Sequence, residues 1–236
     1  STLVQLADAL LLPSSGNVVV DGMNTRDKKR LRELRRRVGL VFQYPERQLF
    51  ASTVADDVAY GPRALGFDAP DVEEGVRRAL ELVGFDYDDV SERSPFALSG
   101  GQQRRVAIAG VLAMEPRVLI LDEASSMLDP RGRKGLMKAC HALHERGMTI
   151  VMITHFMEEA AEADRVAVFQ AGRVAMLGTP EEILTRADEL ARLNLDIPAS
   201  CCFGRALCAK GVPICAQVRE ADMVADIVQA YAERSR

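Results

Sequence analysis

Two consecutive carboxylates follow an apolar run in the middle of the chain. Val118 to Leu121 reads V-L-I-L, and Asp122 and Glu123 come directly after it. Such a run is typical of a buried parallel strand, and ligands of open α/β sheets bind at the carboxyl ends of their strands. Adjacent side chains on an extended segment point in opposite directions, so one carboxylate can hold a metal ion while the other polarises water. Taken alone, the pattern also fits a strand that ends in an acidic turn.

A glycine pair precedes a predicted helix and forms a second candidate site. Ser99, Gly100, Gly101 and Gln102 lead into a helical pattern that continues to Met114. Ser99 and Gln102 have the S-x-x-Q spacing of a capping box. An ordinary N-cap does not need two glycines, whereas glycines let the backbone approach a ligand and helix N-termini offer N–H donors to an anion. The segment therefore predicts a phosphate contact.

A layered α/β fold is needed to position these residues. Buried runs at 38–43, 118–121 and 149–154 alternate with helical patterns, which predicts a parallel sheet with helices on its faces. Residues 51–98 carry amphipathic helical patterns and turn signals, which predicts a helical insertion. A hairpin over 165–177 is expected at the far end of the sheet.

Two segments near the N-terminus have clear patterns of their own. The pattern from Ser1 to Leu12, which contains an apolar stretch from Val4, predicts a short buried helix. Arg26 to Arg37 contains eight basic and two acidic residues, with Leu31 and Leu34 apolar at helical spacing. This second pattern favours a solvated basic helix, and contact with acidic lipid headgroups is the alternative.

Composition excludes several classes of protein. With 236 residues, of which 48% are hydrophobic and 27% charged, the chain has the balance of an ordinary globular protein and is not disordered. No apolar run approaches the ~18 residues of a membrane-spanning helix. A net charge of -4 provides no general attraction to nucleic acid. The cysteines lack paired C-x2-C spacing and are predicted to be thiols in a reducing compartment: Cys140, Cys201, Cys202, Cys208 and Cys215.

Five segments, in order and spacing, resemble the nucleotide-binding subunits of ATP-binding cassette (ABC) transporters. They are V-G-L-V-F-Q ending at Gln43, L-S-G-G-Q at 98–102, the strand and acid pair at 118–123, S-M-L-D-P at 126–130, and T-I-V-M-I-T before His155. The resemblance implies a P-loop NTPase-type α/β fold with a parallel sheet core, an α-helical subdomain and a small C-terminal appendage.

The resemblance also implies a domain organisation. The ABC ATPase domain would span residues 1–193 and include the helical subdomain at about 51–115. Residues 194–236 would form the appendage, and a role in dimerisation is implied for it by the resemblance alone.

The resemblance implies a catalytic role for Glu123, His155 and Gln43 and a metal-binding role for Asp122. Asp122 would position Mg²⁺, and Glu123 would act as general base on the attacking water. Gln43 would sense the γ-phosphate and the metal, and His155 would contact the γ-phosphate. The implied cofactors are therefore ATP and Mg²⁺.

Other motif residues are implied to act across a dimer. Ser99, Gly100, Gly101 and Gln102 would cap the ATP that the opposite subunit holds, and Asp129 would reach across the interface. Two subunits would thus enclose two nucleotides.

The first residues resemble the end of the family's phosphate cradle, G-x-x-G-x-G-K-[ST]. Ser1-Thr2-Leu3 matches the residues just after its lysine, which implies that Ser1 is a Mg²⁺ ligand with Gln43 and Asp122 and that Thr2 contacts the nucleotide. On this basis the chain is expected to be truncated within the Walker A motif. It would then bind ATP weakly, because the lysine and the nest of backbone donors are missing.

The segment after Gln43 is similar to the ATPases of energy-coupling factor (ECF) and cobalt-type importers. It reads F-Q-Y-P-E-R-Q-L-F at 42–50 and V-A-Y-G-P at 58–62, and L-D-I-P at 195–198 agrees. The resemblance implies a second, usually paralogous ATPase, a transmembrane coupling protein docked near residues 43–62, and a separate membrane protein that captures a vitamin or metal ion. It places the chain at the cytoplasmic face of the membrane, with no nucleic acid partner.

The residues of this proposed docking region have a second interpretation. Tyr44, Leu49, Phe50 and Tyr60 could belong to the core, although several lie in a loop where exposed apolar side chains often mark an interface.

Members of the same family also act in DNA repair and translation, and these functions are alternatives to transport. DNA-repair members carry a long coiled coil between the two motifs, but the interval 44–97 is too short and lacks heptads. Translation members join two cassettes in one chain. The alternatives retained are another class of ABC importer, or a catalytically impaired half that lends its signature motif to a partner. The presence of Glu123 and His155 favours a working site.

Overall fold

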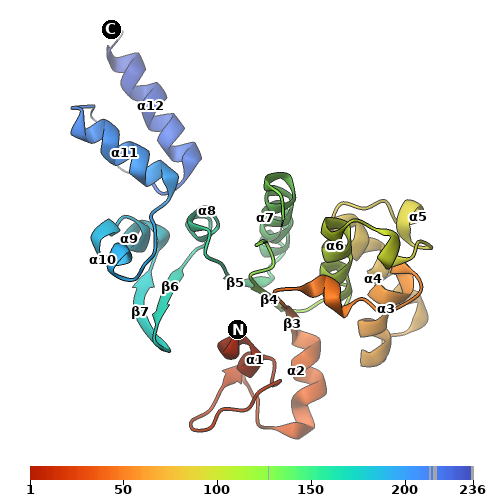
Figure 1. The fold of residues 1–236 in the computed structure, drawn as a ribbon. Coiled ribbons are helices and arrows are strands. Elements are labelled where there is room, and N and C mark those ends of the chain that lie inside the picture. Colours follow the sequence, from red (N-terminus) through yellow and green to blue (C-terminus); the bar gives the residue numbers. More distant parts are fainter. Residues whose placement is uncertain (127, 213, 215–216, 235–236) are drawn as a thin grey trace. The chain divides into compact units, whose positions relative to one another are not determined.

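The computed structural model describes residues 1–126, 128–212, 214 and 217–234. These residues form two compact units, Ser1–Ile153 and Thr154–Arg236 (Figure 1). The sequence places a boundary elsewhere, between an ATPase domain at residues 1–193 and an appendage at 194–236. That boundary stays a prediction.

The first unit is built on a three-stranded parallel sheet, as the sequence predicts. Its strands are β3 (Val38–Val41), β4 (Val118–Asp122) and β5 (Thr149–Ile153), in the order β3-β4-β5. Val38 lies opposite Val118, which lies opposite Thr149. All of β3 and nearly all of β4 is buried, since β3 is apolar throughout and β4 is apolar up to its last residue, Asp122. The shared register brings the carboxyl ends of β3 and β4 to one edge (Figure 1).

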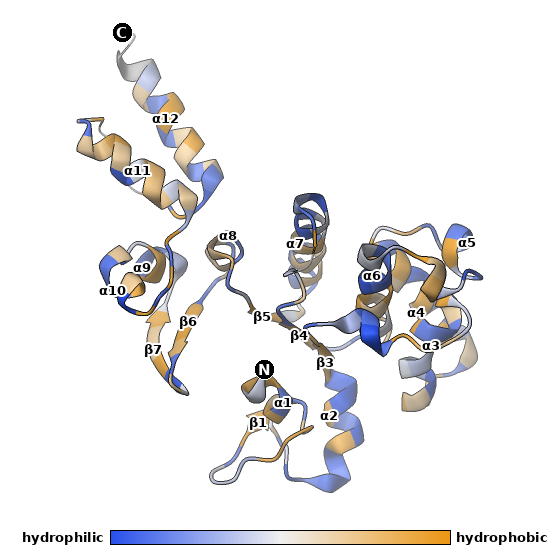
Figure 2. Cartoon of the chain, viewed as in Figure 1, coloured by the Kyte–Doolittle hydropathy of each residue, from blue (hydrophilic) through white to orange (hydrophobic). Residues whose placement is uncertain are grey.

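Helices supply the remaining core of the first unit. Three of them pack against one another around Val58, Leu80 and Val106, and hydrophobic residues are concentrated in the strands and on the inner helix faces (Figure 2). A short helix begins after Asp86, whose carboxylate accepts a hydrogen bond from Asp88 N and caps it. The helices are α2 (Leu31–Arg37), α3 (Val54–Leu65), α4 (Ala69–Leu82), α5 (Tyr87–Val90), α6 (Gly100–Leu112) and α7 (Pro130–Glu145).

The N-terminal helix is shorter and more exposed than the sequence predicts. Helix α1 covers Thr2–Ala7, with Val4 buried, and a small hairpin of β1 (Val19–Val20) and β2 (Met23–Asn24) follows. The prediction of a buried helix as far as Leu12 was wrong, since Leu12 is 53% exposed. Ala9 has a φ of 54° and turns the chain out of the helix, where two successive N–H groups both bond to Gln5 O.

Asp8, at the end of α1, makes stability depend on pH. Burial raises the pKa of this carboxyl from 3.8 to about 6, and the charge of Arg35 opposes the shift. Between these values the unfolded chain has released the proton that the folded chain keeps, so stability falls as pH rises from about 4 and levels off above about 6. We expect Asp8→Asn to raise the free energy of unfolding by up to about 3 kcal/mol at neutral pH. In urea unfolding at several pH values between 4 and 7, the variant should also lack the fall in stability that this carboxyl causes. An unchanged slope would contradict the assignment.

The basic segment forms a helix, and several of its cations have partners within the chain. Arg37 pairs with Asp21 and Glu33, and the guanidinium of Arg36 lies 4.6 Å from the centre of the Phe67 ring. Figure 2 shows α2 as strongly hydrophilic. These pairings favour the solvated helix over a lipid-binding surface.

The second unit combines a hairpin with three short helices and two longer ones among its described residues. Strands β6 (Val166–Gln170) and β7 (Arg173–Gly178) are antiparallel, joined by the Ala171–Gly172 turn. The sequence pattern predicts this hairpin at the end of the parallel sheet, and this prediction is wrong. Among the described residues, β6 and β7 form hydrogen bonds to each other and make a separate two-stranded sheet. The helices are α8 (Met157–Ala161), α9 (Pro180–Leu184), α10 (Ala187–Arg192), α11 (Ala199–Ala209) and α12 (Glu220–Arg234).

Neither a metal cluster nor a membrane span is found in the described part of the chain. Cys140 and Cys201 are buried, Cys202 and Cys208 are exposed, and Cys215 lies outside the described residues. No group of three or more His, Cys, Asp or Glu side chains suited to a metal ion occurs there. The described helices are too short or too polar to cross a bilayer.

Candidate functional site

Four of the predicted site residues meet at the carboxyl edge of the parallel sheet. Gln43 follows β3, and its Nε2 donates a hydrogen bond to Glu123 Oε2 over 3.2 Å. Asp122 ends β4, is only 3% exposed, and its Oδ1 lies 3.9 Å from the backbone nitrogen of Ser1. Thr2 is the first residue of α1. The sheet register therefore unites residues that are far apart in sequence.

The backbone at Glu123 turns sharply after β4. Glu123 has a φ of 52°, in the left-handed region that side chains with a Cβ seldom adopt. Its N–H donates to Ile153 O at 3.0 Å, which anchors the turn to the end of β5. As a result Asp122 stays buried while Glu123 projects toward Gln43, so the two carboxylates occupy different environments.

The residues at this edge fit a magnesium ion. Asp122 would offer a carboxylate, Gln43 an amide oxygen and Ser1 a hydroxyl, which are the hard oxygen donors that Mg²⁺ prefers. Magnesium usually keeps several waters and takes one or two protein carboxylates, so a larger acidic cluster is not required.

The N-terminus of α6 has the predicted capping box. Ser99 N donates to Gln102 Oε1 at 2.9 Å, and Gln102 N donates to Ser99 Oγ at 3.4 Å. A Cβ placed on Gly100 or Gly101 would meet no other atom within 4 Å. Since packing within this chain does not require these glycines, the space beside them is open to another molecule.

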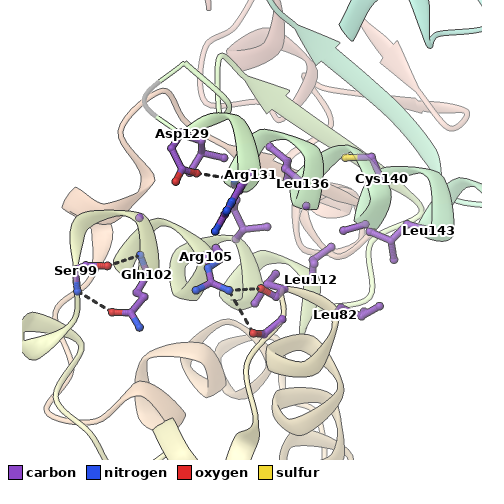
Figure 3. A pocket seen from close by; sticks show the side chains of 18 of the residues that line it. Leu82, Ser99, Gln102, Arg105, Leu112, Asp129, Arg131, Leu136, Cys140 and Leu143 are labelled. Atoms are coloured by element: carbon purple, nitrogen blue, oxygen red, sulfur yellow. Dashed lines mark hydrogen bonds between the residues drawn. The ribbon is translucent and has the colours of Figure 1, made fainter. Parts of the chain in front are cut away.

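Asp129 caps α7 close to the same helix end. Its Oδ1 accepts a hydrogen bond from Gly132 N at 2.6 Å. Asp129, Ser99, Gly101 and Gln102 all line one cavity of about 670 Å³ between α6 and α7 (Figure 3). Met127, in the same sequence motif, lies outside the described residues.

His155 lies in the second unit, in the loop before α8. Its ring centre is 4.3 Å from that of Phe156. Thr154 Oγ1 donates to Glu159 Oε2 at 2.6 Å and accepts from Phe156 N at 3.0 Å, so hydrogen bonds brace the loop on both sides. A role for His155 beside Glu123 stays a prediction.

A buried ion pair that sequence reasoning missed connects two of the motifs. Arg104 on α6 is 2% exposed, and its Nη2 lies 3.1 Å from Glu46 Oε2. The same nitrogen donates to Gln43 O at 3.5 Å. The pair ties the segment after Gln43 to the helix that follows Ser99. Its sequence signal is faint, namely one arginine in a helix whose following residues are mostly apolar and buried.

The apolar residues after Gln43 divide between core and surface. Leu49 is buried, so the core interpretation is right for it. Tyr44, Phe50 and Tyr60 are 39%, 59% and 57% exposed. Phe50 and Tyr60 contact each other edge to face, with ring centres 4.8 Å apart. These three aromatic residues, here called the aromatic surface, remain available to a partner.

The fold and the edge site define a class, and comparisons identify the family. The sheet with its acidic edge is that of a P-loop NTPase-type α/β protein. The family model described as "ABC transporter" matches residues 1–126. The chain therefore belongs to the ABC transporter family, among its ATPase subunits.

Similar proteins carry energy-coupling factor names. The chain is 47% identical to the EcfA2 ATP-binding protein of Clostridium perfringens, covering 92% of this chain and 78% of that protein. It is 52% identical to EcfA2 of Symbiobacterium thermophilum, covering 89% and 74%. The solved structure of cbiO1 from Clostridium perfringens, part of an ABC complex called cbiONQ, matches with a TM-score of 0.70 and 36% identity over 82% of this chain and 77% of that one. The resemblance found in the motifs is thus confirmed.

Proposed function

We propose that the chain is the ATP-hydrolysing subunit of an ECF-type importer of a vitamin or transition-metal ion, and that it works as an ATP-sandwich dimer coupled to a transmembrane protein. The observation that carries the proposal is the hydrogen bond from Gln43 to Glu123 beside buried Asp122. The energy-coupling factor names of similar ATPases support the type of importer.

The proposed chemistry assigns one task to each edge residue. Glu123 accepts a proton from the attacking water, while the amide of Gln43 holds the carboxylate in position. Asp122, Ser1 and Gln43 would hold Mg²⁺, which when bound neutralises charge on the transferred phosphoryl group. His155 would contact the γ-phosphate. Positioning and electrostatic stabilisation account for most of the catalysis of phosphoryl transfer, and a buried sheet edge provides both.

The open space at the N-terminus of α6 supports a dimer. Gly100 and Gly101 have no neighbour within this chain that excludes a side chain, although glycine is a costly residue in a helix. The cost is explained if a phosphate bound to a second subunit approaches the backbone there. Asp129 lines the same cavity and would approach that subunit as well.

Gly101→Val tests the dimer. We expect the variant to fold as the parent does, because a Cβ at this position meets nothing within 4 Å. ATP turnover of the assembled dimer should fall roughly 10- to 100-fold, the loss of one charge-assisted hydrogen bond. Steady-state turnover and the thermal midpoint are the measurements. Lys138→Val, which introduces the same side chain at an exposed position of α7 outside this cavity, is the control. Equal turnover in both variants would argue against a phosphate contact.

The aromatic surface is the proposed docking site for the transmembrane coupling protein. Asp57 Oδ2 accepts hydrogen bonds from the backbone N–H of Phe50 and of Ala51, both at 2.8 Å, which fixes the loop that presents Phe50. Rigid exposed aromatic side chains are frequent anchors of protein interfaces. The chain would thus lie at the cytoplasmic face of the membrane, while a separate membrane protein captures the substrate.

Removing the aromatic surface should uncouple the chain from its membrane partner. Phe50→Ala with Tyr60→Ala is expected to weaken binding to the coupling protein in nanodiscs by about 30-fold or more. Phe169→Ala, which removes a 52% exposed phenylalanine from β6, should leave the affinity unchanged. Affinity would be measured by surface plasmon resonance. Equal affinities for the two variants would exclude this docking site.

A C-terminal role in dimerisation is also proposed for residues 194–236. Helices α11 and α12 carry exposed apolar side chains, with Phe203 52% and Val228 62% exposed. A second subunit, identical or paralogous, could cover them.

A second candidate function is a catalytically impaired half that lends its signature motif to a partner ATPase. The intact capping box at Ser99 favours it. In that case Gly101→Val would still lower the partner's turnover, whereas removing the Glu123 carboxylate would change nothing.

A further inference from the structure

The cavity between α6 and α7 extends far beyond the motif residues on its rim. Its volume of about 670 Å³ is within the range of small-molecule sites. Figure 3 shows Leu112 on α6 facing Leu136, Cys140 and Leu143 on α7 across this space. The inner wall is therefore apolar and suits a hydrocarbon body.

Two guanidinium groups lie among the other residues that line the cavity. Arg105 Nη1 donates to Val83 O at 3.0 Å and to Gly84 O at 3.3 Å, so the side chain is held in place. Arg131 extends from α7 toward Arg105 (Figure 3). Within the described part of the chain neither guanidinium forms an ion pair with a carboxylate. Burial lowers the pKa of Arg105, which is the response of a partly desolvated cation without a counter-ion.

We propose that this cavity binds a small amphipathic anion, with its apolar body between α6 and α7 and its charged group between Arg105 and Arg131. The carboxylate of Asp129 also lines the cavity, so a single negative charge is favoured over a polyphosphate. A monocarboxylate with a hydrocarbon chain has this chemistry. Binding of the anion does not depend on the proposed ATPase mechanism.

Occupancy of the cavity would affect the dimer contacts, and this consequence rests on the proposed function. Ser99, Gln102 and Asp129 line the same space as the apolar wall. A ligand that binds one arrangement of α6 and α7 better than another shifts the population toward it. The anion would thus act as a regulator of ATP turnover.

Calorimetric titration of the full chain with decanoate tests the binding site directly. We expect one saturable site with a Kd of about 1 mM or below. Decanol, which has the chain without the charge, should bind at least about tenfold more weakly, and acetate should give no saturable heat. Absence of saturable decanoate binding, or equal affinity for decanol, would overturn the proposal.

Variants locate the site. Gly135→Leu should lower the affinity for decanoate at least about tenfold, because the new side chain occupies the cavity that Gly135 lines. A Cβ there meets no atom within 4 Å, and leucine is the better helix former, so folding is preserved. Ala139→Leu fills the same wall one turn later and provides a second filling variant.

The charged group is tested on the same helix. Arg131→Gln should weaken decanoate but not decanol, whereas Lys134→Gln, an exposed cation of α7 that does not line the cavity, should change neither. Parental affinity in both filling variants would place the ligand elsewhere and refute the site. Because these are binding measurements, their failure would leave the ATPase proposal untouched.

Discussion

Replacing Glu123 with glutamine is expected to lower ATP turnover of the assembled dimer roughly 10²- to 10⁴-fold. The carboxylate that accepts the hydrogen bond from Gln43 Nε2 is the proposed base, and an amide cannot take a proton from water. The amide oxygen of the new side chain can still accept the bond from Gln43, so the local geometry should persist. Asp122 is unchanged, and ATP binding should therefore be retained.

The same variant should trap the dimer in its ATP-bound form. If hydrolysis reopens the two subunits, a slow chemical step leaves the closed state populated. Size-exclusion chromatography with ATP and Mg²⁺, together with single-turnover kinetics, measures the two effects. Turnover near the parental value would show that Glu123 is not the base, and would favour the second candidate function.

Glu115→Gln is a matched control for this experiment. Glu115 also has a left-handed backbone, with a φ of 51° against 52° for Glu123, but it pairs with Arg78 on the surface. Loss of a surface ion pair costs about 1 kcal/mol or less. Parental turnover in this control would separate the catalytic effect from any general effect of removing a glutamate from a strained position.

Glu46→Ala is expected to cause the largest loss of stability. It leaves the guanidinium of Arg104, 2% exposed, without its counter-charge in the interior. Breaking a buried pair in this way costs 3–5 kcal/mol, and we expect about 3 kcal/mol because the Glu46 side chain is still 23% exposed. Arg104 also donates to Gln43 O, so the loop that carries the proposed sensor should become more mobile.

A double-mutant cycle in guanidinium chloride measures this pair. Arg104→Met should be less harmful than Glu46→Ala, since methionine leaves no charge behind, and the double variant should recover part of the loss. Asp88→Ala breaks the exposed pair with Arg77 and should cost less than about 1 kcal/mol. A similar small cost for Glu46→Ala would mean that the buried pair contributes no more than a surface one.

The sequence alone determined the local elements and the family. The strands at Val118 to Leu121 and Thr149 to Ile153 were predicted correctly from their continuous apolar runs. The expected burial is confirmed for the first strand and wrong for the second, where Val151 is 41% exposed, because an apolar run does not record which surface covers it. The capping box at Ser99 could also be predicted, because its two partners lie only three residues apart in the sequence. Motif order then indicated an ABC ATPase, which the comparisons confirmed.

Only the tertiary structure decided which distant residues touch. Gln43 and Glu123 are 80 residues apart, and Arg104 and Glu46 are 58 apart; the pairing of β3 with β4 and the packing of α6 bring them together. The early end of α1 at Ala7 and the separate hairpin of β6 and β7 were likewise missed. The apolar pattern of a sequence shows which side chains avoid water. It does not show which surface covers them or which strand forms hydrogen bonds with their backbone, because both depend on register and packing across the whole unit.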